Sequence, residues 1–135
     1  MTDAAKGPRE RPMSPHMQVW RWHITMASSI AHRATGVGLY VGALIAAGWA
    51  IALASGPDGY AEFKALMGSP IGLIVMFGLT VCFFYHLANG VRHLVWDTGH
   101  GLDVRSANAS AVAVFAFAAA ATIVVWVIAG LTGAL

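Results

Sequence analysis

A histidine inside an apolar stretch is the residue of this chain best suited to chemistry. His86 lies well within the apolar run 65–91, where an ionisable side chain is costly and usually functional. Asn89 and His93 follow it three and seven positions later, which places the three side chains on one face of a helix. We predict that a polar group or a metal lies against this face. A histidine satisfied by a backbone carbonyl or a neighbouring helix is the simpler alternative.

A second polar cluster opens the first long apolar stretch. Ser29 and Arg33 are one helical turn apart, and Ser28 and His32 form the adjacent pair. A hydroxyl donor beside a permanent cation suits a carbonyl that becomes an anion on reduction, so the cluster predicts a quinone site. The structural alternative is that the serine bonds back to its own helix and the arginine reaches lipid phosphates.

The composition indicates that these residues lie in a lipid bilayer. Hydrophobic residues make up 58% of the 135 residues and charged residues 10%, against roughly 25% charged in soluble domains. Charge-free windows at 34–57, 65–91 and 106–135 each exceed the ~20 residues that a spanning helix needs. We predict an all-α, integral-membrane bundle of three transmembrane helices, at about 25–54, 68–97 and 107–131. A short N-terminal cytoplasmic or interfacial segment, 1–24, precedes this domain, 25–135.

The basic residues predict the orientation of the bundle. Seven of the eight Lys and Arg residues fall on one side of the predicted membrane, and only Lys64 lies in the opposite loop, 55–64. The positive-inside rule makes the richer side cytoplasmic. We therefore expect a multi-pass membrane protein with a cytoplasmic N-terminus and its C-terminus on the opposite side; in a bacterium this corresponds to an inner-membrane protein with a periplasmic C-terminus. On this interpretation the net charge of +2 reflects topology rather than nucleic-acid binding.

Small residues and a single thiol limit what the helices can hold. Gly38 and Gly42 form a GxxxG pattern in the first span, which allows close approach of another helix. A flat cofactor could also lie in the space that these small residues leave beside the helix. Cys82 is the one cysteine of the sequence. An iron–sulfur cluster encoded by this chain alone is excluded, because such clusters require four ligands.

Three motifs together resemble one known family. They are RPMSPH at 11–16, SIAHRATG at 29–36 and HLANGVRHLVWD at 86–97. In order and spacing they closely resemble the cytochrome b membrane-anchor subunit of succinate dehydrogenase (succinate:quinone oxidoreductase, respiratory complex II), over nearly the whole chain. Each motif is weak by itself, whereas three in register on a three-span chain are specific.

The resemblance implies a role for each polar residue. His86 would be an axial ligand of a haem b iron, with the other ligand supplied by a second hydrophobic anchor subunit. Ser29 and Arg33 would help to form the ubiquinone site, which the iron–sulfur subunit and the second anchor complete. His32, Arg33 and His93 match positions near the haem propionates. For His32 and His93, interfacial solvation or a structural hydrogen bond is the alternative.

The resemblance also implies a place in a larger enzyme. The chain would be a subunit of succinate:ubiquinone oxidoreductase that anchors the flavoprotein and iron–sulfur subunits to the membrane, with no complete active site of its own. Electrons from succinate would pass through the iron–sulfur subunit to ubiquinone, in the respiratory chain and the tricarboxylic acid cycle.

Helix depth gives a further expectation about the haem. Counted from Asp97, His86 lies roughly 16 Å into the membrane at 1.5 Å per residue, whereas His32 lies near the mouth of the first helix. The difference in depth predicts that His86 shares an iron with a histidine of another chain rather than with His32. Arg33, Arg92 and His93 are expected to form a cationic mouth for the propionates.

Other functions remain open at this stage. A fumarate reductase anchor would run the same couple in reverse, and residue spacing hardly separates the two. A haem-free structural anchor is a further alternative, although it has no evident use for His86. A small transporter subunit is disfavoured, because the third span and the outer halves of the others have almost no polar groups along a path.

Overall fold

The computed structural model describes residues 21–133, and these fold into four helices with no strand among them. The helices are α1 (Ile24–Ala54), α2 (Pro57–Met67), α3 (Pro70–Asp97) and α4 (Val104–Leu131). Of these, α1, α3 and α4 are long and apolar enough to cross a membrane. The predicted all-α fold with three spans is therefore confirmed. Most of the predicted N-terminal segment, 1–24, lies outside the described residues.

The helix ends follow from local capping chemistry. The Ser69 hydroxyl accepts a hydrogen bond from the Gly72 backbone N–H at 3.1 Å, so α3 begins at Pro70. Asp103 accepts one from the Ser106 N–H at 3.0 Å, and α4 consequently begins at Val104, three residues earlier than expected. The division into an N-terminal segment, 1–24, and a membrane domain, 25–135, stays a prediction.

The expected loop at 55–64 is mostly helix. Pro57 occupies the first turn of α2, Asp58 also lies in that turn, and Lys64 lies in the last turn. This order suits a helix, because proline tolerates the first turn and the two charges complement the helix dipole. Gly56 makes the entering bend with φ +95°. The charges that suggested a loop are therefore the charges of a short exposed helix.

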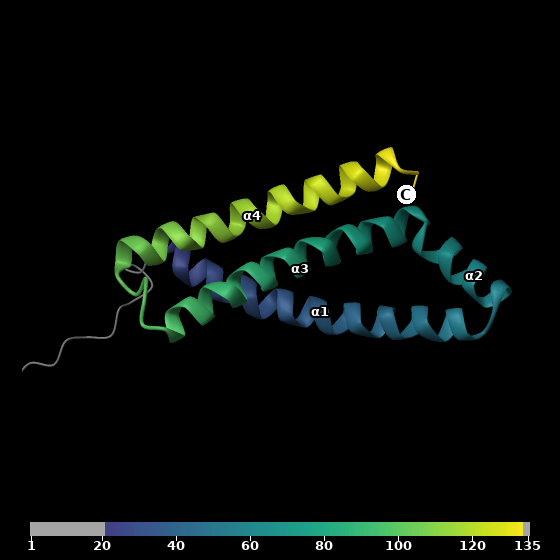
Figure 1. Ribbon diagram of the computed structural model, residues 1–135, viewed down its shortest axis with the longest axis horizontal. Helices are drawn as coiled ribbons and strands as arrows, with labels where there is room; N and C mark the ends of the chain where they lie inside the picture. Colours follow the sequence, from purple (N-terminus) through teal and green to yellow (C-terminus); the bar gives the residue numbers. More distant parts are fainter. Residues whose placement is uncertain (1–20, 134–135) are drawn as a thin grey trace, which may run out of the picture.

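The α3 helix is the centre of the arrangement. It packs against both α1 and α4, and α2 contacts both α1 and α3. In Figure 1, α1 and α3 cross and then diverge towards α2, which connects their separated ends, while α4 runs along the other side of α3. The short α2 therefore acts as a spacer at one end of the bundle.

Glycines allow the close contact between α1 and α3. A Cβ atom built at Gly38 would lie 2.8 Å from Cys82 Sγ, and one built at Gly42 would lie 3.3 Å from Leu79 Cδ2. A side chain at Gly38 would force Cys82 to shift, and one at Gly42 would press Leu79 by a few tenths of an ångström, so the two glycines let the helices approach closely. The packing role predicted for the GxxxG pattern is therefore confirmed.

The interior of the described chain is small and partly polar. Tyr85, Val114 and Ala118 form the apolar cluster, and most large apolar side chains of the three spans are exposed. Exposed apolar side chains are expected where helices face lipid or partner helices.

Candidate functional site

The structure brings three predicted histidines together. The rings of His32 and His86 are stacked, with centroids 3.9 Å apart and planes 13° from parallel. The His93 ring lies 5.4 Å from that of His32 at a tilt of 54°, and it forms a T-shaped pair with the Trp96 ring at 5.2 Å. The cluster therefore joins α1 and α3 at one level of the bundle.

This stacking corrects the expectation that His32 and His86 differ in depth. His32 is the ninth residue of α1, while α3 continues eleven residues beyond His86 to Asp97. His32 is thus eight residues from the start of α1 and His86 is eleven from the end of α3. The difference of three residues amounts to only about 4.5 Å of helix rise, and the crossing of the helices absorbs it. The expectation that His32 and His86 do not share one iron therefore cannot rest on a difference in depth. It rests instead on the stacking, because stacked rings turn their faces, and not their nitrogens, towards each other.

Thr35 and Gly36, one turn after His32 on α1, lie against the His86 ring. Its Nδ1 lies 3.3 Å from Thr35 Oγ1, and a Cβ atom added at Gly36 would lie 3.3 Å from its Cε1. The neighbouring His32 Nε2 is buried and has no hydrogen-bond partner among the described residues. A buried polar nitrogen without a partner is costly, so the cluster has a hydrogen-bond requirement that the described residues do not meet.

The two residues predicted to bind a quinone lie at the surface of α1. Ser29 and Arg33 are both exposed, one turn apart, beside the histidine cluster. Neither makes a side-chain hydrogen bond or ion pair within the described residues. Their polar groups are therefore available to a ligand or to another subunit.

Ser28, the neighbour of Ser29, is instead completely buried. Its hydroxyl donates to Asn89 Oδ1 at 3.1 Å and accepts from Arg92 Nη1 at 3.2 Å. Tyr85 Oη donates to the Ser28 carbonyl at 2.8 Å and lies 3.0 Å from its hydroxyl. Ser28 is thus the centre of a buried polar network between α1 and α3.

Arg92 extends this network to α4. Its Nε donates to Ser110 Oγ at 2.9 Å, and its Nη2 donates to the Ala107 carbonyl at 2.9 Å. A third donor reaches Asn89 Oδ1 at 3.2 Å, and the guanidinium lies 3.9 Å over the Trp96 ring. The expectation that Arg92 belongs to a cationic mouth for propionates is therefore wrong, because its donors are used to join the helices.

The face predicted to carry His86, Asn89 and His93 is divided by these contacts. His86 packs on α1, Asn89 is buried in the network, and His93 is exposed. No group of three or more His, Cys, Asp or Glu side chains within residues 21–133 is arranged to hold a metal ion. The described residues offer single imidazoles, the kind of donor that an axial haem position takes.

Comparison with known proteins decides the family. The model of the succinate dehydrogenase/fumarate reductase transmembrane subunit family matches residues 7–125. The chain belongs to this family.

Relatives of this transmembrane subunit occur in bacteria and mitochondria. It is 35% identical over 116 residues to the succinate dehydrogenase cytochrome b556 subunit of Paracoccus denitrificans, covering 86% of this chain and 88% of the relative. It is 35% identical over 118 residues to that subunit of Rickettsia felis, covering 87% and 92%. Identity to the mitochondrial cytochrome b560 subunit of Sus scrofa is 38% over 106 residues, covering 77% of this chain and 63% of the relative.

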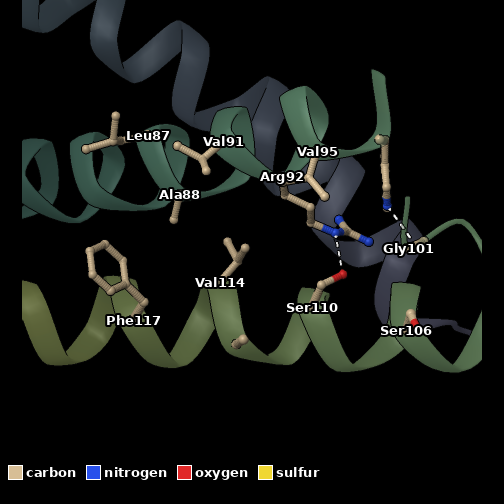
Figure 2. Close-up of a pocket in the computed structure, with 12 residues that line it drawn as sticks. Leu87, Ala88, Val91, Arg92, Val95, Gly101, Ser106, Ser110, Val114 and Phe117 are labelled. Atoms are coloured by element: carbon tan, nitrogen blue, oxygen red, sulfur yellow. Dashed lines mark hydrogen bonds between the residues drawn. The ribbon is translucent and has the colours of Figure 1, made fainter. Parts of the chain in front are cut away.

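A cavity of about 560 Å³ on this transmembrane subunit lies away from the histidines. Figure 2 shows it between α3 and α4, with Val91, Val114 and Phe117 along its apolar length and the Arg92–Ser110 hydrogen bond towards one end. Apart from Arg92, whose donors join the helices, none of the predicted haem or quinone residues lines it. The cavity is therefore separate from the candidate site.

Proposed function

We propose that this chain is the cytochrome b anchor of a succinate-oxidising complex, in which it supplies one axial haem ligand and part of a ubiquinone site. The single observation that carries the proposal is the His86 imidazole held between α1 and α3, next to a buried and unpartnered nitrogen of His32. The family and the names of the relatives support the same function. Those names also favour succinate oxidation over fumarate reduction.

The residues around His86 fit a haem ligand. His86 would hold haem b through one ring nitrogen, and the second ligand would come from a second hydrophobic anchor subunit. When bound, the haem accepts and returns one electron at a time. His32, Arg33 and His93 would lie on the propionate side, where the permanent charge of Arg33 suits carboxylates.

Ser29 and Arg33 would bind the quinone at the exposed edge of the same cluster. The Ser29 hydroxyl would donate a hydrogen bond to one quinone carbonyl, and Arg33 would stabilise negative charge that develops there on reduction. Both side chains are exposed in this chain. That exposure leaves room for the iron–sulfur subunit and the second anchor to complete the pocket.

The assembly would lie in a bacterial inner membrane. The basic residues favour a cytoplasmic N-terminus and a periplasmic C-terminus. The flavoprotein and iron–sulfur subunits would then dock at the cytoplasmic face, next to Ser29. Protons for quinone reduction would reach the pocket from that side.

Optical spectroscopy of the membrane complex tests the haem assignment. Reduced minus oxidised spectra should show a six-coordinate b-type α-band that His86→Ala abolishes or perturbs. His100→Ala is the matched control, because His100 is exposed and, within residues 21–133, its side chain is hydrogen-bonded to Thr98 alone. It should leave the band unchanged. An α-band unaffected by His86→Ala, or no band in the unmodified complex, contradicts the proposal.

Steady-state kinetics test the quinone assignment. Ser29→Ala and Arg33→Gln should lower kcat/KM for ubiquinone, by about 10-fold or more for each lost polar contact, and should spare succinate oxidation by an artificial acceptor that bypasses the membrane. Arg105→Gln, an exposed cation on α4, is the control. Equal losses with both acceptors would place the defect in assembly rather than in the quinone site.

A further inference from the structure

Thr35 connects the two stacked histidines through one hydroxyl. Its Oγ1 lies 3.0 Å from the His32 backbone carbonyl oxygen, one turn earlier on α1. The same oxygen lies 3.3 Å from Nδ1 of His86 on α3. Thr35 is therefore placed to act on His86.

The proton count of this arrangement decides the protonation of the ring. A threonine hydroxyl has one proton, and a carbonyl can only accept. The hydroxyl donates this proton in its shorter bond, to the His32 carbonyl at 3.0 Å, and its oxygen then accepts from His86 at 3.3 Å. An unprotonated Nδ1 would set two acceptors against each other, so Nδ1 carries the proton and Nε2 of the neutral ring keeps its lone pair.

We propose that Thr35 is a positioning residue that fixes the Nδ1–H tautomer and the orientation of His86, which makes Nε2 the nitrogen that binds iron. This inference rests on the proposed haem function. Histidines that bind metals commonly donate their other N–H to an acceptor of the protein, which fixes the ring and raises its basicity.

Two neighbours of Thr35 restrict the same ring. The His32 ring covers one face of His86 at 3.9 Å, and Gly36 is so close that an added Cβ would lie 3.3 Å from Cε1. One turn of α1 thus supplies a stacking surface, a hydrogen-bond acceptor and a close backbone contact. Of the three, only the acceptor distinguishes the two ring nitrogens.

The acceptor has a predictable effect on the iron. Greater basicity of the ligand stabilises ferric over ferrous haem, and it therefore lowers the midpoint potential. Removing the Thr35 oxygen should raise the potential and weaken haem retention by about 10–100-fold, the usual cost of losing such a partner.

Three substitutions in the intact complex test the proposal. Thr35→Val and Thr35→Ala both remove the oxygen, the first with retained volume and the second with retained helix propensity, whereas Thr35→Ser keeps it. The first two should raise the midpoint potential in a redox titration and lose haem faster to apomyoglobin, while Thr35→Ser stays near the unmodified protein. Thr122→Val is the control, since Thr122 is a buried threonine on α4 that donates only to its own helix.

The outcomes separate this inference from the proposed function. If Thr35→Val and Thr35→Ala leave the potential and haem retention unchanged, or if Thr35→Ser behaves as they do, Thr35 does not position His86. If His86→Ala leaves the α-band unchanged, the haem assignment itself fails. Nitrogen NMR of histidine-labelled membranes adds a reading independent of the iron, because the proposal requires His86 to be protonated at Nδ1.

Discussion

Replacing Ser28 by alanine tests whether the buried polar network holds the bundle together. The Ser28 hydroxyl makes one hydrogen bond to Asn89, receives one from Arg92 and shares the proton of Tyr85. Alanine removes these contacts and adds no bulk. The adjacent Ser29 is exposed, so Ser29→Ala is a control of the same chemistry one residue away.

The expected cost follows from the partners that remain. Hydrogen bonds between membrane helices contribute on average about 0.6 kcal/mol and at most about 1.7 kcal/mol. Tyr85 keeps the Ser28 carbonyl, and Arg92 keeps Ser110, Asn89 and the carbonyl of Ala107, so no buried charge is left without partners. We expect Ser28→Ala to lower the free energy of unfolding by about 1–2 kcal/mol, a factor of roughly 5–30 in the unfolding equilibrium.

Unfolding of the purified complex by increasing SDS, followed by far-UV circular dichroism, measures this difference. Ser29→Ala should stay within about 0.5 kcal/mol of the unmodified protein, as exposed substitutions usually do. Equal shifts for the two variants, or no shift for Ser28→Ala, would refute the reasoning. The first result would mean that burial does not distinguish the two serines, and the second that the network contributes nothing to stability.

Two further predictions concern packing and pH. Gly38→Ala should destabilise the bundle by about 1–3 kcal/mol, because the new Cβ would lie 2.8 Å from Cys82 Sγ. Cys82→Ala should restore stability in the double variant, whereas Gly78→Ala, with open space around Gly78, should not destabilise the bundle. The same SDS titration measures all of these variants. The hydrogen bonds from Ser106 hold the pKa of the Asp103 carboxyl below its usual value. The cap therefore stabilises α4 fully at a pH above the ordinary carboxyl pKa of the unfolded chain. This stabilisation is lost as the pH falls through the lowered pKa of the folded protein. Asp103→Asn, which also caps a helix, should therefore reduce the loss of melting temperature below about pH 4, and an unchanged pH profile would contradict the cap's contribution.

The sequence predicted the three spans because hydropathy and charge act along a single chain. A spanning helix satisfies its own backbone, so its existence needs no knowledge of its neighbours. The same reasoning missed α2, because Asp58, Glu62 and Lys64 break the apolar pattern while still suiting an exposed helix. Its signals were local: Pro57 in the first turn, with an acid early and a base late.

The candidate site was harder to predict because it depends on how two helices cross. Spacing placed Ser28 with His32 and Ser29 with Arg33, but it did not reveal which serine is buried. Depth counted along each helix separated His32 from His86, whereas the structure stacks their rings.

The roles of Thr35 and Arg92 were equally hidden. Arg92 reads as a cation at a helix mouth until Ser110 of α4 is placed beside it, and Thr35 becomes relevant only when His86 lies across from it. One sign of these contacts was present in the sequence, namely that each span contains a polar residue.

The crossing of α1 and α3 has a mechanical consequence. When two crossed helices rotate relative to each other, they move most at their far ends and least where they cross. Here that pivot lies along the contact from Gly36 to Gly42. Adding one residue to α2 would change the span between the far ends by about 1.5 Å, yet His86 sits beside the pivot and would hardly move. The histidine cluster is thereby insulated from variation in the length of α2, whereas a side chain added at Gly36 would press on it directly.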